Sequence, residues 1–141
     1  MAITKNDTGV TWSASASASV SAGGTQTSDE VTIDASCFAA SITFKADNSN
    51  GSPAADDIIY FRLLINGADP DGASSDEFDT AGHAPAIAVL DTSVEDPAQI
   101  TVELPPAAVH AKGFKVYADG AEAGTTNSIT VSSTVYEHRS A

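Results

Sequence analysis

The side chains that could carry chemistry are few and lie far apart along the chain. The three histidines, His83, His110 and His138, fall in predicted loops or near the chain end, and no His-x-x-x-His pair is present to place two of them on one face. Cys37 is the only cysteine, which excludes a disulfide within one chain and a metal site made of cysteines alone. We interpret Cys37 as a small buried apolar side chain, and we predict no catalytic, cofactor-binding or metal-binding residue.

Carboxylates are concentrated in one segment. Residues 69–79 hold five of them, from Asp69 to Asp79, and such oxygen clusters are what calcium prefers. The spacing does not fit the helix-flanked calcium loop, which needs acidic or amide residues at alternate positions, Gly at the sixth and Glu at the twelfth. We therefore interpret residues 69–79 as a solvated turn, in which Asp-Pro and Asp-Gly serve the backbone. Residues 47–53 have the same interpretation.

Short catalytic motifs are missing from the sequence. It contains no Gly-x-Ser-x-Gly turn, no Gly-x-Gly-x-x-Gly and no phosphate-binding loop. A serine-histidine-aspartate triad can converge from any spacing, but 17 serines make a chance match easy to find. The sequence therefore predicts that the protein is not an enzyme and uses no cofactor.

The charge narrows the choice of partners. Six basic residues face 19 acidic ones, so the formal net charge is −13, and Arg62 is the only base between Ala46 and Ala111. Nucleic-acid binding depends on Lys and Arg that displace counterions from phosphates, so we expect no nucleic-acid partner. No apolar run approaches 18 residues, so we expect no membrane partner. The first residues lack a hydrophobic signal segment, and we expect the chain to fold in a cytoplasm.

Apolar residues recur with a period of two, which is typical of half-buried strands. In residues 10–20 apolar residues alternate with Ser and Thr, and this predicts one long strand with a dry face. We predict seven further strands around residues 31–33, 42–46, 58–65, 86–90, 99–104, 113–118 and 128–136. Trp12, Phe44, Phe61 and Phe114 are in phase with apolar neighbours and are expected in the core, whereas Tyr60, Tyr117 and Tyr136 are expected at a rim or an interface.

About eight short strands separated by turn-rich segments predict an all-β fold. We expect a single antiparallel β-sandwich, either a jelly roll or an immunoglobulin-like fold. The segments with helix-favouring composition, 107–112 and 121–123, are too short for stable helices. We divide the chain into an N-terminal arm (1–9), the sandwich domain (10–137) and a C-terminal tail (138–141). Both ends are candidate arms for adding to a neighbour's sheet.

Several segments resemble small β-sandwich virion proteins encoded among the structural genes of tailed bacteriophages. The segments that carry the resemblance are residues 59–64, 69–72, 76–80, 90–92, 95–97, 112–118 and 127–132. The resemblance implies a structural component of a phage particle and, among such components, a decoration (cement) protein. Such a protein would bind the major capsid protein lattice on the outer surface of the head, stabilise it, and form a homo-oligomer there.

Two other functions stay open from the sequence. Proteins of similar kind occur in phage tails, necks and fibres, so a tail, neck or fibre-associated virion protein is one alternative. Sandwich domains also serve as binding modules for carbohydrates or host surfaces, which would require exposed aromatic side chains or a calcium site near residues 69–79.

Overall fold

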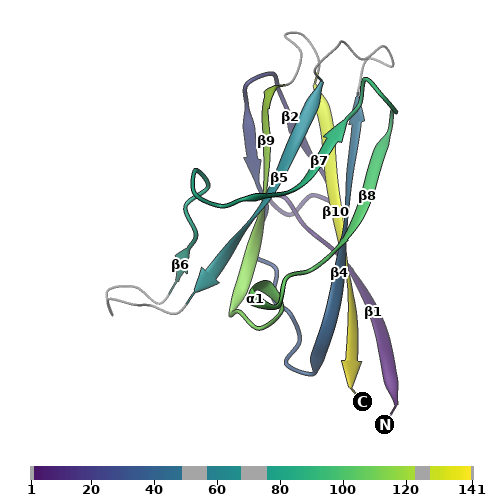
Figure 1. Cartoon of the computed structure of the whole chain (residues 1–141), viewed down its shortest axis with the longest axis vertical. Helices are drawn as coiled ribbons and strands as arrows, with labels where there is room; N and C mark the ends of the chain where they lie inside the picture. The colour runs from purple at the N-terminus through teal and green to yellow at the C-terminus, as the bar shows by residue number, and fades with distance from the viewer. Residues whose placement is uncertain (1, 49–56, 68–75, 123–127, 141) are drawn as a thin grey trace.

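The structure is a computed structural model that describes residues 2–48, 57–67, 76–122 and 128–140. It confirms the predicted antiparallel β-sandwich: nearly all the regular structure is strand, and the sheets pack face to face (Figure 1). The elements are β1 (Ile3–Gly9), β2 (Ala18–Val20), β3 (Thr25–Thr27), β4 (Cys37–Asn48), β5 (Ile58–Gly67), β6 (Glu77–Phe78), β7 (Ala86–Asp91), β8 (Ala98–Glu103), α1 (Pro106–Val109), β9 (Gly113–Glu122) and β10 (Ile129–Ser140).

The strand order identifies the kind of sandwich. The first sheet has the order β1-β10-β4-β8, with β2 also paired to β10, and the second has the order β3-β9-β5-β6, with β7 also paired to β5. Most consecutive strands along the chain lie in opposite sheets. Apart from β1 and β6, the sheet with the order β2-β10-β4-β8 faces the sheet with the order β3-β9-β5-β7. This is the double Greek-key order of a jelly roll, whereas an immunoglobulin-like sandwich keeps its first two strands in one sheet.

The core lies between the sheets and follows the period of two. Phe44 of β4, Phe61 of β5 and Phe114 of β9 are fully buried, and Trp12 is 3% exposed. The four aromatic residues expected in the core are therefore confirmed there. Alternate side chains of β4, β5 and β10 point to solvent, which leaves each sheet with one outer face.

The prediction of one long strand over residues 10–20 is wrong. The chain turns sharply at Ser13 and Ala14, whose φ angles are 48° and 66°, and a bridge joins Trp12 to Ser15. The carboxylate of Asp29 holds this turn, since its Oδ2 accepts the Ala14 N–H at 3.0 Å. Ser and Ala have little intrinsic preference for strands, so these contacts decide the local structure.

Other local expectations are corrected by long-range pairing. The predicted strand at 31–33 is only a single bridge between Val31 and Phe114, and α1 is a one-turn helix at Pro106–Val109 that forms as part of the packed domain. The strands β1, β3 and β6 were not expected. No helix in the described parts of the chain is long and apolar enough to cross a bilayer.

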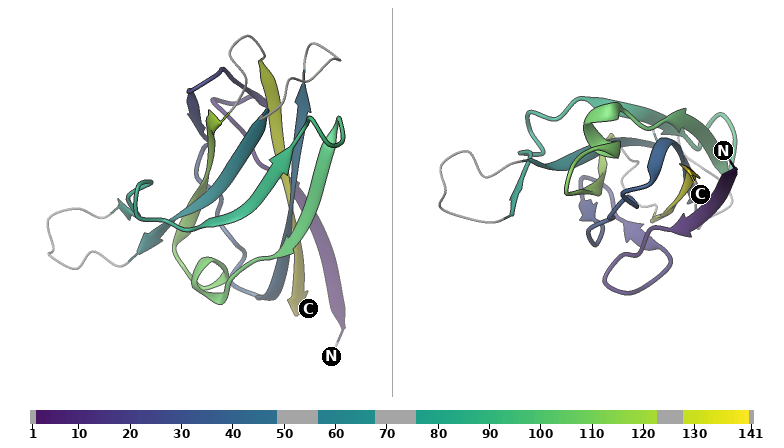
Figure 2. Two further views of the ribbon diagram at one scale, coloured as in Figure 1. Left: turned by 45° about the horizontal axis from the view of Figure 1, so that its top comes forward. Right: turned by 90° about the horizontal axis from the view of Figure 1, so that it is seen from below.

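Both ends of the chain belong to the first sheet. Residues 3–9, assigned from the sequence to an N-terminal arm, form β1 and pair antiparallel with residues 134–140 of β10. The end of β10 includes residues 138–140, which the sequence assigned to a tail. The two termini therefore lie together at one pole of the sandwich, and β1 forms a margin of the sheet (Figures 1 and 2).

Candidate interaction face

The outer face of the first sheet carries a field of small hydroxyl side chains. In register across the sheet, Thr134 of β10 lies opposite Thr43 of β4, which lies opposite Thr101 of β8. The Oγ1 atoms of Thr43 and Thr101 lie 2.7 Å apart in a hydrogen bond. We call this field the hydroxyl face; it comprises Ser41, Thr43, Thr101, Ser132 and Thr134. The longer side chains of Lys45, Gln99 and Glu103 lie on the same outer face, since they alternate in register with these hydroxyls.

Aromatic side chains lie at one end of the hydroxyl face. Phe38 is 51% exposed and Tyr136 is 46% exposed, although both are large enough to gain from burial. The ring of His138 lies 6.3 Å from that of Phe38, at an interplanar angle of 35°. We call Phe38, Tyr136 and His138 the aromatic corner.

A β-bulge explains why Phe38 points outward. His138 pairs with Ala39 and Arg139 pairs with Cys37, so Phe38 is the extra residue in β4. A bulge bends its strand and can redirect a side chain. The alternation of β4 therefore restarts at this point, and Phe38 joins the outer face while Cys37 and Ala40 are buried.

An ion-pair cluster lies behind the bulge. The guanidinium of Arg139 donates two hydrogen bonds to the buried carboxylate of Glu137, from Nε to Oε2 at 2.8 Å and from Nη2 to Oε1 at 3.2 Å. Asp34 approaches the same guanidinium at 3.7 Å, and its backbone N–H donates to Glu137 at 3.3 Å. The hydrogen bonds that Arg139 donates to Glu137 raise the pKa of Arg139. This fork geometry fixes the end of β10 and, with it, the aromatic corner.

Cys37 is buried beside this cluster. Burial raises the pKa of the Cys37 thiol above its ordinary value, and the charge of Glu137 raises it further. A thiol is nucleophilic only as the thiolate. Cys37 is thus a protonated, buried side chain at neutral pH.

A shallow groove of about 300 Å³ adjoins the aromatic corner. It runs between β4 and β8 and is lined by Ala39, Ala40, Ser41, Thr101, Val102, Glu103 and His138. Most of the lining side chains are small, and an imidazole and a carboxylate are among them. A groove of this kind can receive one side chain or a short segment of a protein partner.

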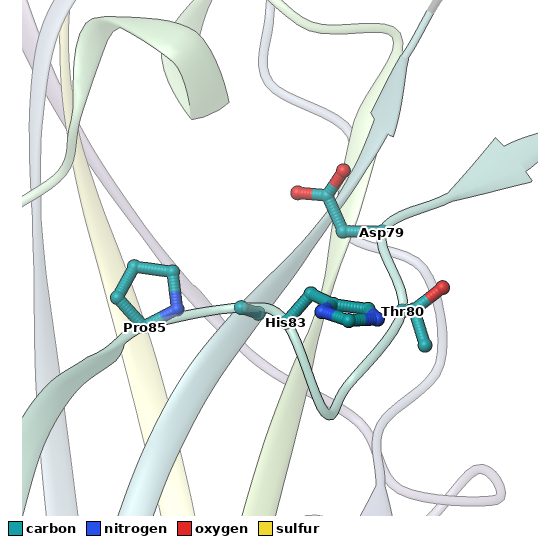
Figure 3. A pocket seen from close by; sticks show the side chains of 5 residues that line it. Asp79, Thr80, His83 and Pro85 are labelled. Carbon is teal, nitrogen blue, oxygen red and sulfur yellow. The ribbon is translucent and has the colours of Figure 1, made fainter.

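A second pocket, of about 240 Å³, lies in the loop that follows β6 (Figure 3). It is lined by Asp79, Thr80, His83, Ala84 and Pro85. The His83 N–H donates to the Thr80 carbonyl at 2.9 Å. At the end of β5 the Asp79 N–H donates to the Ile65 carbonyl at 2.9 Å, and the Ile65 N–H donates to the Asp79 carboxylate at 3.3 Å. Among the residues that the structure describes, no group of three or more His, Cys, Asp or Glu could hold a metal ion.

The acidic segment at 69–79 is described only from Asp76 onward; residues 69–75 lie outside the described residues, as do 49–53 of the second acidic loop. Asp76 accepts hydrogen bonds from Lys112 and from Asn66, and these contacts lower its pKa. Asn66 also donates to Glu30 at 2.9 Å. These described carboxylates therefore hold β5 and β6 against the segment that precedes β9.

The remaining predicted residues are spread over the molecule. His83 lies in the loop before β7, His110 ends α1, and His138 lies in β10. Tyr60 and Tyr117 are half-buried on the outer face of the second sheet, beside the ion pair of Arg62 and Asp119 at 2.9 Å.

Comparison of the chain with models of protein families finds no match, and a search of curated proteins finds no related sequence.

Proposed function

We propose that this protein is a non-enzymatic structural component of a tailed-phage virion, a decoration (cement) protein that binds the outer surface of the capsid. The observation that carries the proposal is the hydroxyl face with its aromatic corner. The proposed partner is the major capsid protein lattice, to which the protein binds after folding in the host bacterial cytoplasm.

A sheet face that combines short hydroxyls with exposed aromatic side chains suits a protein lattice better than it suits a small molecule. Protein interfaces combine a few aromatic anchors with a polar surround that packs closely. Phe38 and Tyr136 would supply the anchors, and Ser41, Thr43 and Thr101 would supply short donors and acceptors. Short side chains lose little conformational entropy when they are covered.

The resemblance to phage virion proteins supports the same function. Its segments include much of β5 and β9 and the beginning of β10, so it extends over both sheets of the sandwich. The net charge of −13 keeps the rest of the surface hydrated and repels DNA, which suits the outside of a head.

Binding to undecorated capsids tests the proposal. The purified protein is mixed with capsids of the phage that encodes it, and the bound fraction is measured by co-sedimentation over a concentration series. We expect saturable binding at lattice stoichiometry. Phe38→Ser and Tyr136→Ser should each weaken it by about tenfold or more. Val89→Ser serves as the matched control, because Val89 is 49% exposed on the second sheet and should leave binding unchanged.

The same purified protein distinguishes the two other functions, a tail, neck or fibre component and a carbohydrate-binding module. If the protein binds purified tails, necks or fibres and leaves capsids bare, it is a component of those structures and the head assignment fails. If it binds neither and a glycan screen gives a signal that Tyr136→Ser abolishes, the aromatic corner is a carbohydrate site.

A further inference from the structure

We infer that β1 pairs with β1 of a second copy across a two-fold axis, so that two first sheets join edge to edge. The inference does not depend on the virion assignment. Within the described residues β1 pairs only with β10, which leaves its other edge open along seven residues, Ile3–Gly9. In Figure 1 this strand lies at the margin of the molecule.

The direction of the backbone groups of β1 follows from one contact. The Val10 N–H donates to the Ser133 carbonyl at 2.9 Å, in register with the β1–β10 ladder. Residues of an antiparallel strand alternate between facing the partner strand and facing away. The N–H and C=O groups of Thr4, Asn6 and Thr8 therefore face β10, and those of the odd residues 3, 5, 7 and 9 face the open edge.

Only a few registers of β1 against β1 of the second copy can satisfy those open groups. In each of them an odd-numbered residue of one copy must lie opposite an odd-numbered residue of the other. The register centred on Lys5 places Lys5 opposite Lys5 of the other copy, and the register centred on Asp7 places two aspartates opposite each other. Like charges in these positions oppose pairing. The register centred on Asn6 places Lys5 of each copy opposite Asp7 of the other, and it also uses the whole length of β1.

The side chains agree with this register. Lys5 lies opposite His138 and Asp7 lies opposite Tyr136, so both charged side chains are on the outer face of the sheet and both are exposed. Two Lys-Asp cross-strand pairs would form on that face, while Thr4 would meet Thr8 on the other. A lone lysine on an edge strand normally prevents edge pairing. Here the complementary aspartate two residues away makes the edge self-complementary, as a two-fold interface requires.

The arrangement has a geometric consequence. A two-fold axis through an antiparallel strand pair is perpendicular to the sheet, so both outer faces point the same way. The two hydroxyl faces and aromatic corners would form one continuous surface, with the open groups of both β1 edges paired.

Charge reversal tests the inference. Sedimentation equilibrium of the full chain, run up to millimolar concentration, should show a monomer–dimer equilibrium. Lys5→Asp and Asp7→Lys should each raise the dimer dissociation constant by about tenfold or more, because two attractive pairs become repulsive. The double variant Lys5→Asp/Asp7→Lys should restore the dimer. Lys45→Asp is the control for Lys5→Asp, since it changes the net charge by the same amount on the same outer face but away from the edge.

A cysteine at the axis reports the register directly. Asn6 of one copy would lie opposite Asn6 of the other in a non-hydrogen-bonded pair, where Cα atoms are close enough for a disulfide. Asn6→Cys should form a covalent dimer under mild oxidation, and Thr8→Cys should not. A chain that stays monomeric at millimolar concentration would overturn the inference. So would a dimer that ignores both charge reversals, or one that cross-links equally well through either cysteine.

Discussion

Phe44 of β4 and Phe61 of β5 stack across the sandwich, with ring centroids 4.6 Å apart and ring planes inclined by 29°. The two rings belong to different sheets, and both are fully buried. The pair therefore joins the hydroxyl-face sheet to the second sheet near the centre of the core. The outward neighbours of Phe44 in β4 include Thr43, so the strand that carries this ring also carries part of the hydroxyl face.

Removal of one ring should be among the most destabilising single changes. We expect Phe61→Ala to lower the free energy of unfolding by about 3–5 kcal/mol, the usual loss for a buried phenylalanine. Urea unfolding can be followed by the fluorescence of Trp12, the single tryptophan, which is 3% exposed. Tyr60→Ala, at the adjacent outward position, should cost clearly less. Equal losses would contradict the placement of the core.

A buried polar network should be sensitive to the loss of one donor. The Asn48 Nδ2 donates to Asp57 Oδ2 at 2.8 Å, and the Thr92 Oγ1 donates to the Asp57 carbonyl at 3.0 Å; all three residues are buried. Asn48→Ala removes a hydrogen bond to a buried carboxylate, and we expect a loss of about 2–3 kcal/mol in unfolding free energy.

Thr92 offers a matched pair of variants in the same network. Thr92→Val keeps the shape and removes the hydroxyl, so it should cost about 1 kcal/mol, whereas Thr92→Ser keeps the hydroxyl and should cost less. If valine proves as stable as the wild type, the network contributes little to folding.

The turn at Ser13–Ala14 should make the free energy of unfolding depend on pH in the acid range. The backbone N–H of Ala14 and the hydroxyl of Thr11 donate to Asp29, and they hold the pKa of its carboxyl below the ordinary value of 3.8. The folded state therefore binds this proton less readily than the unfolded state does. The stabilisation is present above about pH 3.8 and is lost as the pH falls through the lowered pKa.

Asp29→Asn tests this sign. The wild type should be more stable than the variant at neutral pH, and the difference should shrink in urea titrations below pH 3.8. Asp47→Asn removes the same charge from an exposed side chain and controls for net charge. A difference that grows toward acid would contradict the assignment.

Gly120 is required by close packing between the sheets. A Cβ at this position would lie 2.6 Å from Cγ1 of Val20 and 3.0 Å from the carbonyl of Ser21. We expect Gly120→Ala to cost about 1–3 kcal/mol, the usual range for overpacking. Gly82 has nothing within 4 Å of such a Cβ, so thermal unfolding of Gly82→Ala should show little change. Equal melting temperatures for both variants would refute this account of Gly120.

The period of two was enough to locate the central strands. Ile59, Phe61 and Leu63 of β5 are buried as their spacing predicts, since large apolar side chains on one face leave a strand a single way to pack. The same holds for Phe114 and Val116 in β9. Six of the eight predicted strands appear in the structure at nearly the predicted positions.

The failures lie where a distant residue decides the local conformation. In residues 10–20 the alternation of Ala and Ser fits a continuous strand as well as it fits the observed turn. The contact that bends the chain comes from Asp29, 15 residues from Ala14. Phe38 belongs to the candidate interaction face because β10 pairs with β4 across a bulge. The one local sign was the consecutive pair Ala39-Ala40, which interrupts the alternation.

The position of the protein in an assembled particle tests the central claim most directly. A cryo-electron microscopy map of the proposed virion should show jelly-roll density on the outer capsid surface, seated by the hydroxyl face with Phe38 and Tyr136 against the major capsid protein. Density for this protein only at the tail, neck or fibres, or on the head with the second sheet facing the capsid, would contradict the account.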